Sequence, residues 1–188
     1  MRDAALWALL ALVVAATVSI VAHTLKVGIS PMPSSALARA AVLSLTVESL
    51  KGGSHCEIHE LGAGWGTLAF PLARSLPEAR VVAWESSLVP YLFCLLRRAV
   101  SRVSNLELRR ADFHEAQLGS ADAVVCYLFT GGMERLAPKL ERELRDCAIV
   151  VSNTFGLRGW TAETTRTLDD LYHSPVYRYV KRTRTEAA

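Results

Sequence analysis

The chain has 188 residues and a formal net charge of +3; 51% of the residues are hydrophobic and 21% are charged. This length suits one domain with or without an appendage, and the composition excludes a disordered or fibrous protein. The small charge gives no indication of a nucleic-acid partner, because the short basic pairs are typical of solvated helix ends.

Residues 4–22 form the first predicted element, a run of 19 residues without a charge. As a helix rising about 1.5 Å per residue, this run nearly spans the roughly 30 Å hydrocarbon core of a bilayer. Asp3 offsets the positive start and the run exceeds the apolar core of a signal peptide, which disfavours cleavage. A buried core helix usually keeps a polar stripe. We therefore expect a single-pass membrane anchor over residues 1–23, and the positive charges of Lys26 and Arg39 after it predict a cytoplasmic domain.

A linker with two prolines is predicted over residues 24–34, and a single domain over residues 35–183. Strand and helix patterns alternate through this domain. Helices are predicted over residues 35–50, with its cap at Ser34 or Ser35, 66–76, 86–103 and 132–144, the last with a break at Pro138. The helix over 86–103 has Leu88, Leu92, Leu96, Ala99 and Val103 on one side.

Strands are predicted over residues 56–61, 79–85, 106–112, 121–129 and 147–155. The last two are continuous apolar runs, which are typical of central parallel strands covered on both faces. A hairpin around Ser174-Pro175 closes the domain. The fold class predicted is α/β: a doubly wound, Rossmann-like, seven-stranded and mostly parallel sheet with a C-terminal antiparallel hairpin, preceded by one N-terminal transmembrane helix.

The four cysteines, Cys56, Cys94, Cys126 and Cys147, are predicted to be reduced core residues. No two of them form a CxxC pair, and no histidine cluster lies near them. We therefore expect neither a metal site nor a disulfide.

The stretch CEIHELGAGWGTLAF, residues 56–70, combines a strand, a glycine turn and the start of a helix. Gly62 and Gly66 permit the sharp reversal, since glycine adopts backbone angles that other residues avoid. Gly64 lets a ligand approach the backbone because it has no Cβ. The helix that follows contributes unpaired N–H groups and a partial positive charge. Such a turn suits a nucleotide-like ligand, although the spacing by itself also fits a simple tight turn.

Three acids, Glu60, Glu85 and Asp112, lie at carboxyl ends of strands, where an open α/β sheet binds its ligand. Glu85 follows Gly66 by 19 residues, the place at which nucleotide sites put a carboxylate on the ribose hydroxyls. NAD and S-adenosylmethionine (SAM) both remain open. The GxGxxG spacing of NAD sites is absent because position 67 is Thr67, and an acid beside the turn would repel a pyrophosphate. The same acid can hold the amino-acid end of SAM.

These motifs carry a family resemblance. HELGAGWG, with WE after the second strand and AD after the third, resembles the class I SAM-dependent methyltransferases over roughly residues 30–182. ISPMPSS resembles the Pro-x-Pro-Ser/Thr entry segment of a membrane-associated branch, which includes lysine methyltransferases that act on mitochondrial membrane proteins. VVCYLF, ERLAPKLEREL and IVVSNTFGLRGW are similar to bacterial relatives of that branch.

The resemblance implies roles for the matching positions. Glu60 and the three glycines would border the methionine moiety, and Glu85 would hold the ribose. Asp112 and Phe113 would flank the adenine. Tyr127 and Leu128 would face the methyl group and the acceptor.

Two residues are the catalytic candidates. Tyr127 could accept a hydrogen bond from an amine or stack on a cation, and it also fits a plain strand-end aromatic. Asn153 could hydrogen-bond an acceptor. Methyl transfer from an activated donor needs alignment and exclusion of water more than acid–base groups.

Two positions depart from the pattern of the family. Relatives often carry a small or acidic residue in place of Trp65, and a proline near Thr130.

The sequence therefore predicts a membrane-tethered SAM-dependent methyltransferase, in which residues 4–22 contact the membrane. The resemblance implies a protein lysine amine as the acceptor. The alternatives are a methyltransferase acting on a small molecule or lipid, a non-catalytic SAM-binding module, and a nucleotide-dependent oxidoreductase.

Overall fold

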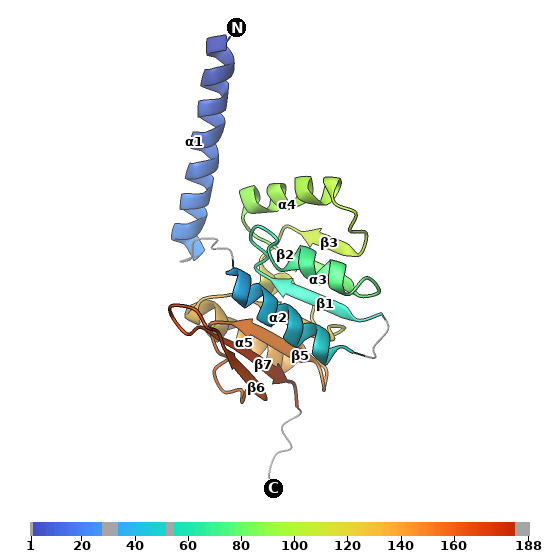
Figure 1. Cartoon of the computed structure of the whole chain (residues 1–188). Coiled ribbons are helices and arrows are strands. Elements are labelled where there is room, and N and C mark those ends of the chain that lie inside the picture. Colours follow the sequence, from blue (N-terminus) through green and yellow to red (C-terminus); the bar gives the residue numbers. More distant parts are fainter. Residues whose placement is uncertain (1, 28–33, 52–54, 183–188) are drawn as a thin grey trace.

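The computed structural model describes residues 2–27, 34–51 and 55–182, and Figure 1 shows an N-terminal helix standing beside an α/β domain. The sheet has seven strands in the order β3-β2-β1-β4-β5-β7-β6. The strands are β1 (Glu57–Leu61), β2 (Arg80–Trp84), β3 (Leu106–Arg109), β4 (Ala123–Cys126), β5 (Ile149–Asn153), β6 (Thr164–Thr167) and β7 (Pro175–Val180). The helices are α1 (Arg2–Val27), α2 (Ala36–Ser49), α3 (Ala69–Ser75), α4 (Leu88–Val100), the short 3₁₀ helix η1 (Phe113–Glu115) and α5 (Thr130–Glu143).

The predicted fold class is confirmed. Strands β3, β2, β1, β4 and β5 are mutually parallel, while β7 runs antiparallel to both β5 and β6. The chain winds outward from β1 in one direction to β3 and then crosses over to β4. The two strands on either side of this reversal are β1 and β4, so the ligand crevice of such a sheet lies at their carboxyl ends.

Some predicted boundaries are wrong. The hairpin turn does not lie at Ser174-Pro175: β6 ends at Thr167, and a longer loop reaches β7. Asp170 organises this loop, because its carboxylate accepts a 2.8 Å hydrogen bond from the Ser174 N–H. The predicted break at Pro138 is also absent, since α5 continues through this residue to Glu143. Proline removes one helical hydrogen bond there, and packing of the apolar face compensates.

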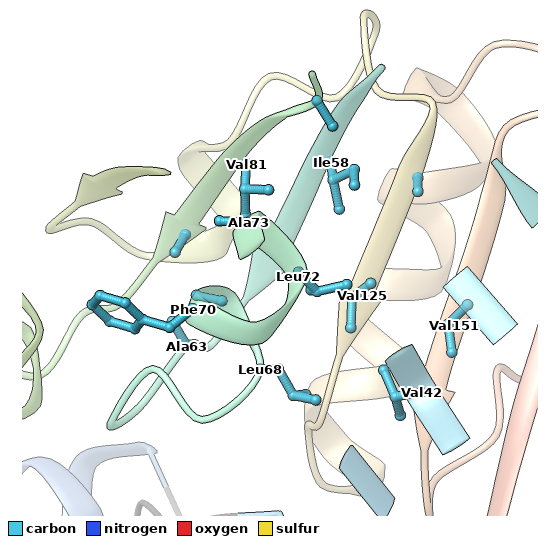
Figure 2. Packing of buried hydrophobic residues seen from close by; sticks show 14 of the residues in the cluster. Val42, Ile58, Ala63, Leu68, Phe70, Leu72, Ala73, Val81, Val125 and Val151 are labelled. Carbon is cyan, nitrogen blue, oxygen red and sulfur yellow. The ribbon is translucent and has the colours of Figure 1, made fainter. Parts of the chain in front are cut away.

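Each face of the sheet has its own core. On one face, α2 and α3 cover a cluster that includes Val42, Ile58, Leu72 and Val125, all of which are fully buried (Figure 2). On the other face, α5 contributes Met133, Leu136, Ala137 and Leu140 to a second cluster. Burying a side chain of this size stabilises the fold by roughly 1.5–3 kcal/mol. Helix α2 begins at its predicted cap, because Ser35 Oγ accepts a 3.1 Å hydrogen bond from the Ala38 N–H.

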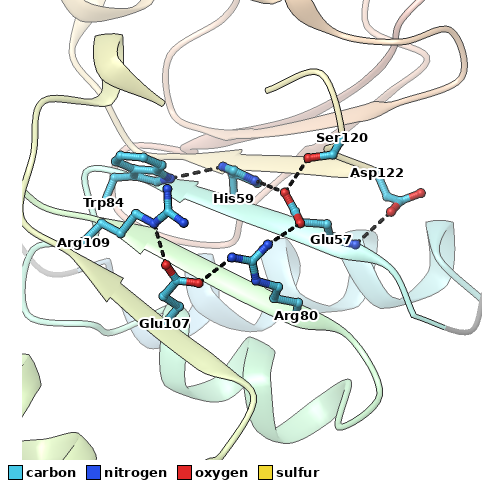
Figure 3. A network of polar contacts seen from close by, with 8 residues as sticks. All are labelled: Glu57, His59, Arg80, Trp84, Glu107, Arg109, Ser120 and Asp122. Atoms are coloured by element: carbon cyan, nitrogen blue, oxygen red, sulfur yellow. Dashed lines mark hydrogen bonds and ion pairs between the residues drawn. The ribbon is translucent and has the colours of Figure 1, made fainter. Parts of the chain in front are cut away.

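A polar network ties β1, β2 and β3 together on one side of the sheet (Figure 3). Glu57 accepts hydrogen bonds of 2.7 Å each from His59, Arg80 and Ser120. These bonds outweigh the effect of burial and bring the pKa of Glu57 down to about 2. Burial lowers the pKa of His59, whose Nδ1 accepts from the Trp84 indole N–H at 3.1 Å. The imidazole is thus neutral, with its proton on Nε2 facing Glu57.

Helix α1 contains one stretch, Ala4–Ala22, that is long and apolar enough to cross a membrane. None of that stretch is buried, and Leu6, Trp7 and Val18 are each at least 60% exposed. The helix continues to Val27, and most of the predicted linker, residues 28–33, lies outside the described residues. Figure 1 shows α1 projecting beyond the domain, and α1 contacts α4.

The prediction that all four cysteines are core residues is wrong for one of them. Cys56, Cys94 and Cys126 are buried, whereas Cys147 is exposed. Cys147 precedes β5 in a turn with a φ of 68°, so it lies before the apolar strand and outside the core.

Candidate functional site

The predicted site residues come together at the carboxyl edge of the sheet. Each parallel strand contributes to this edge near its last residue. Glu60 lies one residue before the end of β1, Glu85 directly follows β2, Asp112 follows β3, Tyr127 directly follows β4, and Asn153 ends β5. The topology therefore groups positions that are up to 93 residues apart in the sequence.

The glycine turn between β1 and α3 has positive φ at all three glycines. A Cβ on Gly62 would lie 3.0 Å from the Leu128 side chain, and one on Gly66 would lie 2.8 Å from the Phe70 ring. Both positions are therefore glycine for packing reasons as well as for backbone reasons. Gly64 differs, because a Cβ there would meet no protein atom within 4 Å. The space over Gly64 is open to a ligand.

Glu85 is fixed by two backbone hydrogen bonds. Its carboxylate accepts one from the Gly64 N–H at 2.7 Å and one from the Ser87 N–H at 2.6 Å. Each carboxylate oxygen has a second lone pair, so both oxygens keep the capacity to accept from ribose hydroxyls. The first bond, which joins the end of β2 to the glycine turn, was not predicted from the sequence; no local pattern signals it.

Glu60 is an unusual buried acid. It is 2% exposed, and its Oε2 atom has no hydrogen-bond partner among the described residues. Burial, and then the nearby charge of Glu85, raise the pKa of Glu60 to about 8, although the Ala69 N–H partly opposes this by donating to the carboxyl. A buried carboxyl without a partner is destabilising unless a cation or donor reaches it. The site therefore favours a positively charged ligand group beside the glycine turn.

Helix α4 holds the glycine turn from the outside. The Cys94 thiol donates to the Gly64 carbonyl at 3.3 Å. The Arg97 guanidinium donates to the carbonyls of Trp65 and Gly66 at 3.3 and 3.2 Å. The Trp65 ring packs edge-on against Phe93, with the ring centroids 5.4 Å apart. Trp65 thus packs against α4. Cys94 and Arg97 stabilise the glycine turn, and their contribution was not predicted from the sequence.

Asp112 and Phe113 begin the short helix η1. Asp112 caps this helix, because its carboxylate accepts a 2.9 Å hydrogen bond from the His114 N–H. Asp112 itself is exposed, and the ring of Phe113 is half-buried against the core on the α5 side of the sheet. An exposed acid next to a fixed aromatic ring can contact both the polar edge and the face of a heterocycle.

Tyr127 and Leu128 follow β4, next to the glycine turn. Leu128 is 6% exposed and packs under Gly62. Tyr127 is half-buried, and its ring is nearly parallel to that of Phe155, with centroids 6.4 Å apart. These two rings follow β4 and β5, so they lie together at the carboxyl edge of the sheet, where an acceptor would enter.

Asn153 is 2% exposed at the end of β5. Its Oδ1 accepts a 3.2 Å hydrogen bond from the Thr154 hydroxyl, and its amide nitrogen lies 3.5 Å from Ser34 Oγ. Ser34 is the last residue of the predicted linker, so the entry segment reaches the site edge at this point. These contacts hold the Asn153 carboxamide in one orientation.

The chemistry of this edge fits SAM, the cofactor expected from the sequence. SAM carries an ammonium and a sulfonium group, which match the Oε2 atom of Glu60 that has no partner among the described residues. The open space over Gly64 admits the ligand to the backbone, and Glu85 retains acceptor capacity for hydroxyls. The separate cavity of about 300 Å³ lined by residues such as Lys51, Asp122 and Arg145 lies at the amino ends of the strands, away from this chemistry.

Comparisons with known proteins identify the family and the fold. The family described as the ANTKMT methyltransferase domain matches residues 60–164, which begin at the acid before the glycine turn and include Asn153. A protein-lysine N-methyltransferase of Saccharolobus islandicus is 29% identical over 125 residues, covering 65% of this chain and 78% of that protein.

Solved structures share the fold. A Salinibacter ruber RNA methyltransferase in complex with S-adenosyl-L-homocysteine has a TM-score of 0.70 at 24% identity, covering 84% of this chain and 98% of that one. A precorrin-6y C5,15-methyltransferase of Geobacter metallireducens has a TM-score of 0.60 at 19% identity, covering 81% of this chain and 94% of that one. At this level of identity the likeness concerns the fold, and proteins with this fold methylate chemically unrelated acceptors.

Proposed function

The chain belongs to the ANTKMT methyltransferase domain family and is a class I SAM-dependent methyltransferase, and from this premise we propose that it methylates a lysine side chain of a protein located at a membrane. The observation that carries the choice of acceptor is the similarity to a protein-lysine N-methyltransferase. The apolar helix α1 supports the location.

The proposed cofactor contacts follow from the geometry. Glu60 would accept hydrogen bonds from the ammonium of the methionine moiety, which would satisfy its unpartnered oxygen. Gly64 would lie against the cofactor, since a side chain there would occupy that space. Glu85, held by the N–H groups of Gly64 and Ser87, would accept from the ribose hydroxyls. Asp112 and Phe113 would contact the edge and face of the adenine.

The residues around the acceptor need only orient and desolvate it. When bound, SAM supplies a methyl group activated by its positive sulfur. The lysine amine must arrive neutral and aligned, because only its lone pair can accept the methyl. The Tyr127 hydroxyl is proposed to accept a hydrogen bond from this amine, while the rings of Tyr127 and Phe155 exclude water. The fixed carboxamide of Asn153 is proposed to orient the acceptor at the same edge.

Helix α1 is proposed to be the membrane tether. Its 26 residues make a helix about 39 Å long, which exceeds a hydrocarbon core of roughly 30 Å. Figure 1 shows the arrowheads of β1 and β5 pointing to the side of the sheet on which α1 ends. The carboxyl edge therefore faces the same side as the tether, which suits an acceptor held in or on the membrane.

Transfer of label tests the acceptor class. Membranes from cells lacking the protein are incubated with tritiated SAM and the purified full chain, and the labelled product is hydrolysed. We expect methyl-lysine in a protein band, which disappears with Asn153→Ala and Tyr127→Ala. Label in RNA, lipid or a small molecule would contradict the proposed acceptor while leaving the methyltransferase activity intact.

A glycine pair tests the cofactor site. Gly64→Ala and Gly159→Ala both place a Cβ in open space at a positive φ, at 54° and 79° respectively. The backbone strain of roughly 1–2 kcal/mol is therefore shared, and only Gly64 adjoins the proposed cofactor. We expect calorimetry to show at least a tenfold loss of S-adenosylhomocysteine affinity, about 1.4 kcal/mol, for Gly64→Ala alone. Equal affinities for the two variants would contradict the assignment.

A further inference from the structure

Helix α4 presents its apolar face to the outside of the domain. Leu92, Phe93, Leu96 and Val100 are 47%, 45%, 71% and 86% exposed, and Leu88 at the start of the helix is 41% exposed. The residues of α4 that are buried are Pro90 and Cys94. The side of the predicted helix that carries Leu88, Leu92 and Leu96 therefore faces outward, whereas Val103, which lies beyond the helix, is buried.

The exposed residues form one continuous stripe. Leu88, Leu92 and Leu96 follow each other at four-residue intervals, and Ala99 and Val100 extend the same side by another turn. Residues at this spacing lie on one face of an α-helix. Helical spacing puts Tyr91 and Arg98 on another side of α4, and Arg97 is turned inward to the glycine turn. A contiguous apolar surface of this kind marks a contact with lipid or protein.

Three features of the surroundings indicate lipid. Helix α4 contacts α1, the helix long and apolar enough to cross a membrane. In the view of Figure 1, α4 runs across the direction of α1, as a helix lying in the plane of a membrane would run across a helix that spans it. Arg98 in the last turn of α4 and the exposed Arg102 just beyond it supply cations beside the stripe, and cations of this kind bind anionic headgroups.

We propose that the outer face of α4, formed by Leu88, Leu92, Phe93, Leu96 and Val100, lies in the interfacial layer of the bilayer that α1 spans. This inference rests on the membrane tether proposed above. An amphipathic helix binds an interface with its apolar side about 5–10 Å below the headgroups. The domain would then contact the membrane at two places, the spanning helix α1 and the interfacial helix α4. Two contacts fix its orientation relative to the membrane.

Depth-dependent quenching tests the proposal on the full chain. A single environment-sensitive fluorophore (NBD) is attached to Leu96→Cys, Leu171→Cys or Leu10→Cys, each in a Cys147→Ser background because the other three cysteines are buried. The proteins are reconstituted into vesicles of phosphatidylcholine and phosphatidylglycerol, with and without doxyl-labelled lipid. Leu171 is the matched control, since it is 86% exposed but lies in the β6–β7 loop. Leu10 reports on the tether.

The proposal predicts that doxyl lipid quenches most of the emission at positions 96 and 10 and little of it at position 171. Quenching at 10 without quenching at 96 would overturn the role of α4 and leave the tether intact. Absence of quenching at both positions would overturn the tether, and the inference with it. A blue-shifted emission at 96 that doxyl lipid does not quench would place a second copy of the chain on this face and would also overturn the proposal.

Discussion

Replacing Glu60 by glutamine separates the stability of the protein from its ability to bind the cofactor. The carboxyl is buried, its Oε2 has no partner among the described residues, and its pKa is raised to about 8 by burial and by Glu85. Glutamine has nearly the same shape and carries no charge at any pH. The Glu60→Gln protein should therefore resemble the protonated form of the wild type.

The size of the effect follows from linkage. In the unfolded chain the carboxyl titrates at its ordinary value of 4.5, whereas in the folded protein it titrates at about 8. A raised acid pKa means that the unfolded state loses its proton first, so the folded state loses relative stability as pH rises above 4.5, until the folded pKa is reached. At about 1.4 kcal/mol per unit, the loss is about 3 kcal/mol at pH 7. Glu60→Gln removes this loss.

Urea unfolding of the full chain in detergent micelles measures this effect. The free energy of unfolding of Glu60→Gln minus that of the wild type should increase from about pH 4.5 to about pH 8 and then level off. The matched control is Glu78→Gln, an exposed acid whose replacement should change the difference little across this range. Parallel curves for Glu60→Gln and the wild type would refute the reasoning, because Glu60 would then ionise as freely as in the unfolded chain.

The same variant should bind S-adenosylhomocysteine more weakly. A neutral amide cannot match a carboxylate as the partner of an ammonium group, and charge-assisted bonds are about twice as strong as neutral ones. Calorimetry of the wild type near pH 7 should also show proton release on binding, because a cationic partner would lower the pKa of Glu60. Stability gained without affinity lost would contradict the role assigned to this residue.

Three further changes test the packing around the site. Gly66→Ala should destabilise the fold by about 2 kcal/mol or more, because its Cβ meets the Phe70 ring at a positive φ, and an unchanged urea midpoint would contradict this. Trp65→Ala should cost about 1 kcal/mol of stability by removing the contact with Phe93, while a selective loss of cofactor affinity would identify a lid. The folded protein should lose stability as pH falls from about 4.5 towards the depressed pKa of Glu57 near 2, and Glu57→Gln should flatten this part of the stability curve.

Much of the fold was predictable because local patterns determine it. The apolar runs of β4 and β5 indicated central parallel strands, and both are fully buried. The glycine turn was predicted after the first strand, and Gly62, Gly64 and Gly66 all have positive φ there. Such features depend on residues that are close in sequence, where periodicity and turn chemistry carry the information.

Other features depended on the tertiary structure. The apolar stripe of α4 predicted a helix correctly, but periodicity cannot tell whether an apolar face contacts the core or the surroundings. The residues of α4 that are buried are instead Pro90 and Cys94. The contact between Asn153 and Ser34 joins residues 119 apart, and the bond from Gly64 to Glu85 depends on the register of β1 and β2. No short sequence pattern encodes either contact.

Helix α4 contacts the glycine turn on one side and carries the exposed apolar stripe on the other. Its inner side fixes the glycine turn through Cys94 and Arg97. Its outer side carries the apolar stripe. If the outer side contacts lipid, the glycine turn on the inner side is held at a constant distance from the membrane surface, because the two sides of one helix move together. An acceptor lysine would then be selected by its height above the bilayer as much as by its neighbouring residues.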